Sequence, residues 1–194
     1  MKWLSLEQSA LTYWADFVIY GLAVVSLAAF VTIKSPGTLW LTAVGCAAAG
    51  FVAWTLVEYL MHRFVLHRVQ PFKGWHDEHH ERPVALMATP TWISAFLILV
   101  VVFAPLAVFS NLWVACAFTL GVLSGYLAYT MTHHATHHWR ASSHWAASRK
   151  RIHARHHHSR VLGDFGVTSQ IWDRVFATSA ATTANGKSQN RQAS

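Results

Sequence analysis

The sequence is poor in charged residues and in cysteine. Asp, Glu, Lys and Arg make up only 12% of its 194 residues, about half the share typical of soluble domains. The two cysteines, Cys46 and Cys116, lie in apolar stretches and form no CxxC pair, which argues against a disulfide framework and a thiolate metal site. The sequence also contains no P-loop or dinucleotide-binding glycine fingerprint, because residues 121–125, GVLSG, read as a GxxxG helix-packing motif within an apolar run.

Long apolar runs are abundant, and hydrophobic residues make up 54% of the chain. Four runs are long enough to cross a bilayer as helices, at residues 11–33, 39–60, 91–109 and 112–131. Residues 34–38 and 110–111 connect them as tight turns, so the runs predict two helical hairpins. We expect Pro105 to kink the third run. Gly and Ala in the second run predict close helix packing in lipid.

The basic residues predict the orientation of these spans. If the first residues are cytosolic and all four runs cross, Lys34 is the only one of the 15 Lys and Arg residues on the far side, which leaves 15 − 1 = 14 on the near side. Every histidine falls on that near side as well. The formal net charge of +7 therefore favours a membrane surface, and we expect no nucleic-acid partner. The predicted protein is multi-pass, with its site facing the cytosol.

Histidine is the residue that carries chemistry here. Of the 14 histidines, only His144 lies outside four clusters, which read HRFVLH, HDEHH, HHATHH and HARHHH. In the third cluster, His133 and His137, or His134 and His138, are four residues apart and would share a helical face. The second and fourth clusters have i, i+3, i+4 spacing, which also gathers imidazoles on one face of a helix.

So many imidazoles predict a site with more than one metal ion. The most economical ligand set has ten members, enough for two ions with about five imidazoles each: His62, His67, His76, His79, His80, His133, His137, His153, His156 and His157. Imidazole binds zinc, copper, iron and nickel, so the ligand type leaves the metal open. Two metal ions close together in a reducing compartment, at the edge of lipid, fit oxygen activation, because two ferrous ions can supply electrons to one dioxygen molecule. A two-zinc hydrolase would more usually recruit bridging carboxylates.

The four clusters, with RPVALMATPTW after the second and FGVTSQIWDRVF near the end, resemble the membrane fatty acid hydroxylase superfamily. Within it, the resemblance is closest to the fatty acid 2-hydroxylases, over roughly residues 58–178. It implies oxygen-dependent hydroxylation of a lipid acyl chain, such as that of a sphingolipid, by a di-iron centre with dioxygen as co-substrate. Zinc would fit the same ligands in a purified sample.

The family pattern HxxxxH, HxxHH, HxxxHH and HxxHH falls on the same ten histidines and on His138. On an α-helix His138 is about 140° around from His133, so we expect it to be an outer-sphere or alternative ligand. His134 and His158 are additional to the pattern, and His144 is expected at the surface. No residue other than the metal ligands is assigned a catalytic role.

The resemblance also implies partners. Eukaryotic relatives carry a fused cytochrome b5-like domain, and only about ten residues precede the first run here, so we expect a separate electron donor, either cytochrome b5-like or a ferredoxin with its reductase. The electron donor would dock on the basic residues Arg149, Lys150, Arg151 and Arg155. An equally good explanation is that these positive charges only fix the orientation of the spans in the membrane. Three acids, Asp77, Glu78 and Asp164, are candidates to orient the imidazole N–H groups.

The expected fold is an all-α integral membrane protein with a histidine-rich cytosolic cap that holds a dimetal centre. Residues 1–178 would form one hydroxylase domain, with the cap at 61–90 and 132–178, residues 170–176 as a short amphipathic helix, and 179–194 as a disordered tail. Alternative functions are a carotenoid ring hydroxylase or a sterol-type oxidase. A histidine-rich metal transporter or a zinc-stabilised scaffold are the non-enzymatic alternatives.

Overall fold

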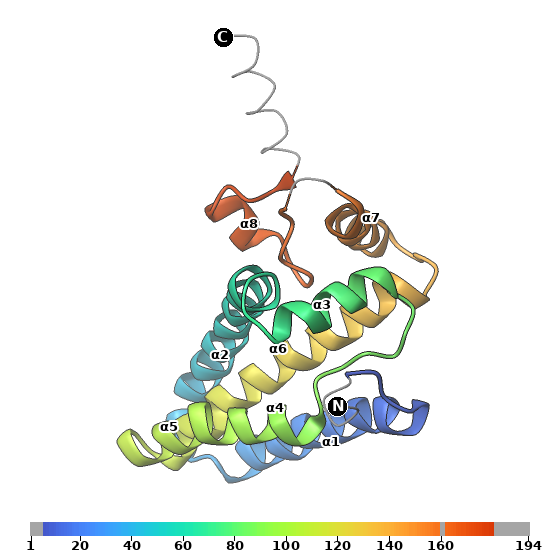
Figure 1. Ribbon diagram of the computed structural model, residues 1–194. Helices are drawn as coiled ribbons and strands as arrows, with labels where there is room; N and C mark the ends of the chain where they lie inside the picture. Colours follow the sequence, from blue (N-terminus) through green and yellow to red (C-terminus); the bar gives the residue numbers. More distant parts are fainter. Residues whose placement is uncertain (1–5, 160–161, 181–194) are drawn as a thin grey trace. The chain divides into compact units, whose positions relative to one another are not determined.

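The computed structural model describes residues 6–159 and 162–180, which are helical throughout apart from connecting loops and one isolated β-bridge between Glu7 and Met87 (Figure 1). The elements in chain order are α1 (Ala10–Lys34), η2 (Gly37–Leu39), α2 (Trp40–Leu60), η3 (Met61–Leu66), α3 (Phe72–Glu81), α4 (Thr91–Leu97), η4 (Ile98–Phe103), α5 (Ala104–Phe109), α6 (Leu112–His138), α7 (His144–His158) and α8 (Ile171–Val175). Among the helices, η2 is a 3-10 turn and both η3 and η4 are π-helical.

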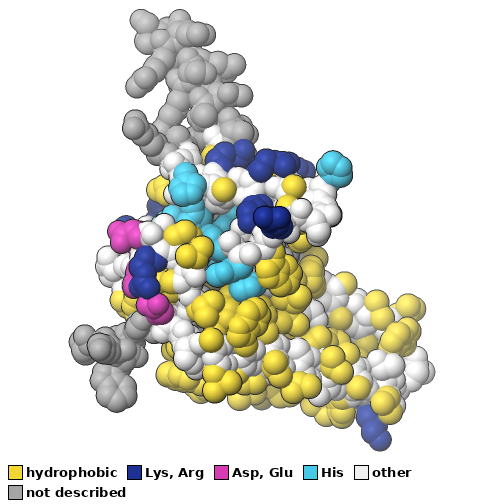
Figure 2. Space-filling view, turned by 90° about the vertical axis from the view of Figure 1, so that its right-hand side faces the viewer, with side chains coloured by type: hydrophobic (Ala, Val, Ile, Leu, Met, Phe, Trp, Pro, Cys, Tyr) yellow, Lys and Arg dark blue, Asp and Glu magenta, His cyan; other side chains and the backbone are white. Residues whose placement is uncertain are grey.

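Four helical stretches are long and apolar enough to cross a membrane: Ala10–Lys34, Gly37–Leu66, Thr91–Phe109 and Leu112–His138. Large apolar side chains on them face outward, as for Leu41 at 85% and Phe109 at 88% exposure. Hydrophobic side chains cover the surface of these helices on the face shown in Figure 2. In water this exposure would be costly, so lipid is the solvent that fits these surfaces.

The chain forms two compact units. The first comprises the residues up to Trp54 together with Ala85–Ala128, and so contains α1, most of α2, α4, η4, α5 and most of α6. Its core has two clusters, one around Tyr20, Ile98 and Tyr126 and the other around Val31 and Ala117.

Glycines allow α2 and α6 to approach closely within this first unit. A Cβ atom at Gly50 would lie 2.1 Å from the carbonyl oxygen of Phe118, and one at Gly121 would lie 2.0 Å from that of Ala47. Both distances are far below van der Waals contact, so only glycine fits at these two positions. The helix-packing role predicted for GVLSG and for the Gly- and Ala-rich second run is therefore confirmed.

Local signals account for the ends of several helices. Ser9 accepts a hydrogen bond from the backbone N–H of Thr12 at the start of α1, and Ser143 accepts one from Ala146 at the start of α7. The disturbance expected at Pro105 takes the form of the π-helical segment η4, which ends just before Pro105 in the first turn of α5. Proline has no N–H to donate, so the regular hydrogen-bond ladder must change next to it.

The second unit comprises Thr55–Val84 and the described residues from Tyr129 onward. It contains the end of α2, η3, α3, the last turns of α6, α7 and α8, and it carries every histidine cluster. The predicted short helix at residues 170–176 is present as α8, and its Asp173 is fully buried. Residues 181–194, most of the predicted tail, lie outside the described part of the chain.

Candidate metal centre

The first histidine pair lies on and just after the π-helical segment η3. His62 is its second residue and His67 follows it directly, five residues later. On an α-helix two residues at that spacing point about 140° apart. In a π-turn the backbone hydrogen bond joins residues five apart, which brings these two side chains onto one face. Their ring centroids accordingly lie 5.1 Å apart.

The three histidines of α3 point toward two different groups of imidazoles. The Nε2 atoms of His76 and His80 lie 3.0 Å apart, so this i, i+4 pair points to one place. His79 instead has its Nε2 atom 3.1 Å from that of His133, which comes from α6. The i, i+3, i+4 pattern therefore divides its imidazoles between two neighbours.

The last turns of α6 present two faces. His133 and His137 have ring centroids 4.9 Å apart and face the other clusters, and the Nε2 atom of His137 lies 2.8 Å from that of His153. His134 and His138 stack on each other with ring centroids 4.3 Å apart. The structure thus separates the two i, i+4 pairs that the sequence left as alternatives.

The fourth cluster, on α7, also divides. His156 brings its Nε2 atom within 3.1 Å of that of His67, whereas His153 pairs with His137. His157 lies between, because its Nε2 atom is 3.1 Å from that of His153 while its ring stacks on His80 with centroids 4.1 Å apart.

Two groups of converging nitrogens result, each with its ligand nitrogens within 4.8 Å of one another. The five-histidine group is His62, His67, His76, His80 and His156, and the four-histidine group is His79, His133, His137 and His153. These nine and His157 are the ten residues of the predicted ligand set. His134, His138, His144 and His158 belong to neither group, and of these four only His134 is buried. Each group can hold a metal ion.

Burial keeps these imidazoles neutral, as metal binding requires. Burial first, and neighbouring histidines second, lower the pKa of His67 and of His79 from 6.5 to about 3. The same causes lower the pKa of His80 to about 4, although Asp77 and the His157 backbone oppose this shift, and that of His157 to about 2. Burial also lowers the pKa of His76. All five therefore present free nitrogen lone pairs at neutral pH.

One loop fixes the orientation of two imidazoles. The Nδ1 atom of His62 lies 2.6 Å from the backbone oxygen of Phe165, and that of His156 lies 2.8 Å from the oxygen of Gly163. A carbonyl only accepts, so each Nδ1 carries the hydrogen and each Nε2 keeps its lone pair for the centre.

The three acids expected to orient imidazoles have other partners. Asp77 pairs with Lys73, and Glu78 pairs with Arg82, the residue that follows α3. Asp164 instead accepts two hydrogen bonds from the Arg155 guanidinium, at 2.6 and 2.9 Å, which raises the pKa of Arg155.

Two acidic residues that the sequence pattern did not single out, Glu58 and Asp173, hold the loop at residues 163–168 in place. Asp173 accepts the backbone N–H groups of Phe165 and Gly166 at 2.9 and 2.8 Å, and Glu58 accepts those of Val167 and Thr168 at 2.7 and 2.9 Å. In the sequence, Glu58 stands four residues before the first histidine cluster, and Asp173 lies among apolar residues in the segment 170–176. Neither shows which backbone groups it binds.

The basic residues predicted as a dock are only partly available. The Arg155 guanidinium is bound to Asp164, and Lys150 donates to the backbone oxygen of Trp139. The Nε and Nη1 atoms of Arg149 are buried. Arg151 remains exposed. Histidine side chains reach the surface beside Lys and Arg side chains in Figure 2.

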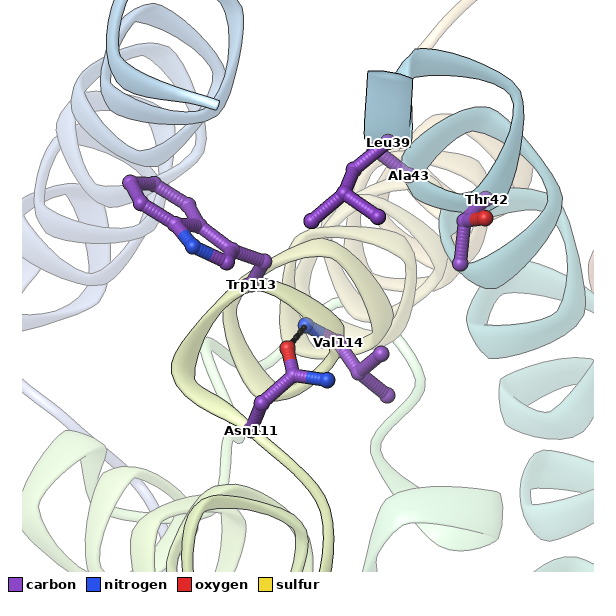
Figure 3. Close-up of a pocket in the computed structure, with 6 residues that line it drawn as sticks. All are labelled: Leu39, Thr42, Ala43, Asn111, Trp113 and Val114. Atoms are coloured by element: carbon purple, nitrogen blue, oxygen red, sulfur yellow. Dashed lines mark hydrogen bonds between the residues drawn. The ribbon is translucent and has the colours of Figure 1, made fainter. Parts of the chain in front are cut away.

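A small pocket in the first unit has a different character. It lies where η2, α2 and the start of α6 meet, and it is lined by Leu39, Thr42, Ala43, Asn111, Trp113 and Val114 (Figure 3). Its one internal hydrogen bond, from the Val114 N–H to the Asn111 side-chain oxygen at 3.0 Å, caps the start of α6. No histidine lines it, so we assign it no part in the centre.

The sequence of the chain is similar to that of known hydroxylases. The sequence model of the family described as "Fatty acid hydroxylase" matches residues 47–178. A dihydroceramide fatty acyl 2-hydroxylase of Arabidopsis thaliana is 30% identical over 178 residues, which cover 86% of this chain and 70% of that protein. The fatty acid 2-hydroxylase of Rattus norvegicus is 31% identical, over 75% of this chain and 42% of its own length.

A solved structure is similar as well. It is described as full-length scs7p with only the hydroxylase domain visible, and it superposes with a TM-score of 0.77 at 27% identity. The match covers 91% of this chain and 69% of the other. The match therefore extends through both compact units of the present chain.

Proposed function

The chain belongs to the fatty acid hydroxylase family and is an enzyme, and on this basis we propose that it hydroxylates carbon 2 of a lipid acyl chain with a dimetal centre and dioxygen. The observation that carries the proposal is the convergence of ten imidazoles into two neighbouring groups. The family match over residues 47–178 spans both units, so we treat residues 1–178 as one hydroxylase domain.

We assign one metal ion to the five-histidine group and one to the four-histidine group with His157. Two features of the residues fit first-row metal ions. Each of the ten side chains offers an Nε2 atom within about 3 Å of another, and the lowered pKa values keep the nitrogens deprotonated.

The donor set favours redox chemistry over hydrolysis. Neither group contains a carboxylate among the described residues, whereas two-metal hydrolases usually bridge their ions with carboxylates. When bound and reduced, two iron ions would supply electrons to dioxygen and an oxidant for the acyl C–H bond. Zinc would bind the same nitrogens in a purified sample. The protein's own part is to hold the nitrogens rigidly and to keep them neutral.

We propose that the four candidate spans form two hairpins and that the histidine-bearing unit is a cap facing the cytosol. The distribution of Lys and Arg supports this orientation, since only Lys34 falls on the opposite side. The histidines occur on and just after η3, at the end of α6 and on the polar helices α3 and α7, and none lies in the middle of a span. A transporter would more often have its ligands at mid-span.

The substrate proposal draws on the relatives. The Arabidopsis protein is named for dihydroceramide, and a Schizosaccharomyces pombe relative, 32% identical over 66% of this chain, is named for ceramide. The acyl chain of a sphingolipid is therefore the proposed substrate. The electron donor is proposed to be a separate cytochrome b5-like protein or a ferredoxin with its reductase, which would dock near the exposed Arg151.

Lipid mass spectrometry tests this function directly. Membranes that contain the protein, supplied with iron and a reducing system, should gain acyl chains heavier by one oxygen, which fragmentation places at carbon 2. His156→Ala should abolish this product while the protein stays in the membrane. His144→Ala is the matched control, because His144 is exposed and belongs to neither group, and it should retain activity. An unchanged acyl pool with oxidised carotenoids or sterols would transfer the proposal to those substrates.

A further inference from the structure

The loop that orients His62 and His156 is held by two buried carboxylates. Four consecutive backbone N–H groups, at residues 165–168, donate to Asp173 and Glu58. Asp173 is completely buried and Glu58 is 5% exposed. Hydrogen bonds from N–H groups to buried carboxyl oxygens are strong, because water does not compete for either partner.

Side-chain hydroxyls strengthen both attachments. The Thr178 hydroxyl donates to Asp173 at 2.8 Å, and the Thr168 hydroxyl donates to Glu58 at 2.5 Å. Thr178 is itself joined to the loop, since its carbonyl oxygen accepts the N–H of Asp164 at 3.0 Å. The carbonyls of Gly163 and Phe165 are therefore fixed from both sides, which fixes where the two Nδ1 hydrogens must point.

Only the five-histidine group receives this support among the described residues. His62 and His156 both belong to it. In the four-histidine group, the Nδ1 atom of His153 is buried and has no hydrogen-bond partner in the described part of the chain, and the same holds for the adjoining His157. A ligand imidazole with a fixed Nδ1 hydrogen bond is better oriented and a stronger base than one without.

We propose that Glu58 and Asp173 are positioning residues, which act through the loop at residues 163–168 to make the five-histidine group the tighter metal site, filled before the four-histidine group. The inference rests on the proposed function, because it takes both groups to bind metal. Loss of an outer-shell partner of a metal ligand typically weakens metal binding by about 10- to 100-fold. The effect should fall on one of the two sites only.

Cobalt titration of the full chain tests the ranking. The detergent-solubilised protein is stripped of metal and titrated with Co²⁺ against a competing chelator, with the visible d–d absorption as readout. The wild type should bind two equivalents in two steps. His133→Ala should remove the weaker step and His62→Ala the tighter one, which assigns each step to its group.

The positioning role is then tested by Asp173→Asn. This variant should weaken the tighter step by about 10- to 100-fold and leave the weaker step unchanged. Glu81→Gln is the control, because Glu81 is exposed at the end of α3 and belongs to neither group, and it should move neither step. If Asp173→Asn weakens the Co²⁺ affinity of both steps equally, the variant has caused a general loss of stability and the proposal is overturned. An unchanged affinity of both steps would overturn it as well.

A second variant decides the matter if Asp173→Asn does not fold. Glu58→Gln keeps the shape and one acceptor oxygen but replaces the other oxygen with an NH₂ group, which cannot accept a hydrogen bond, so the tighter step should weaken by a smaller factor than in Asp173→Asn. Glu78→Gln, on the exposed face of α3, is its control. An unshifted tighter step in Glu58→Gln refutes the positioning role. A wild type that binds fewer than two Co²⁺ ions instead refutes the dimetal function on which the inference rests.

Discussion

Replacing Gly50 by Ala should loosen the contact between α2 and α6. The added Cβ would lie 2.1 Å from the carbonyl oxygen of Phe118 and 3.1 Å from the backbone nitrogen of Val122. Both are backbone atoms, which cannot rotate aside as a flexible side chain can, so the two helices must separate. Overpacking of this kind costs about 1–3 kcal/mol, and the rigidity of the obstacle favours the upper half of that range.

The assay is thermal unfolding of the detergent-solubilised protein. For a chain of this size each kcal/mol shifts Tm by about 2–4 °C, so Gly50→Ala should lower Tm by about 4–12 °C. Gly45→Ala is the control on the same helix, because nothing lies within 4 Å of a Cβ at Gly45. There the gain in helix propensity, about 1 kcal/mol, should leave Tm unchanged or slightly higher. Equal Tm values for the two variants would refute the close-approach argument.

Three further expectations concern the second unit. In metal-stripped protein the pKa of His67 and of His79 is about 3, below the ordinary 6.5, so the unfolded chain binds more protons than the folded chain between these two pH values. The free energy of unfolding therefore falls as the pH falls below about 6.5. Tm should be lower at about pH 5 than at about pH 8, and an unchanged Tm would contradict this. Ala177 has φ of 51°, in the left-handed region, so Ala177→Gly should raise Tm by about 1–4 °C, whereas a lower Tm would show that the strain is not relieved. Arg155→Lys should lower Tm less than Arg155→Met in the same assay, because Lys keeps a charge for the buried Asp164 carboxylate; the reverse order would show that this ion pair does not matter.

The helical runs and the histidine clusters could be predicted because both depend on local spacing. Apolar runs of about 20 residues give spanning helices whatever they pack against. An i, i+4 spacing gathers side chains on one face whatever lies opposite. That is why the helices and the set of converging imidazoles follow directly from the residue pattern.

The division of ligands between two groups depends on tertiary placement instead. Spacing alone predicts that His76, His79 and His80 share a face, but it does not show that His79 meets α6 while its neighbours meet η3 and α7. Spacing on an α-helix also fails for His62 and His67, since it sends the two rings apart unless the turn is π-helical.

The binding partners of the acidic residues could not be predicted from local sequence spacing either. Asp77 and Glu78 are adjacent to ligands in sequence but reach Lys73 and Arg82. Glu58 and Asp173 are 115 residues apart by number, and only the folded loop brings its N–H groups to both. A carboxylate that binds backbone amides leaves no pattern of partner side chains in the sequence.

The π-helical segment η3 places a constraint on the length of the chain. It holds one residue more than an α-helical path over the same rise would need. Deleting a single residue between His62 and His67 would leave the two histidines at i, i+4 spacing, at which an ordinary α-helix also gathers them on one face. A family member with one residue fewer at this point should therefore have an α-helical turn here and still bring its two histidines together, so the length of this stretch and the type of its turn should vary together.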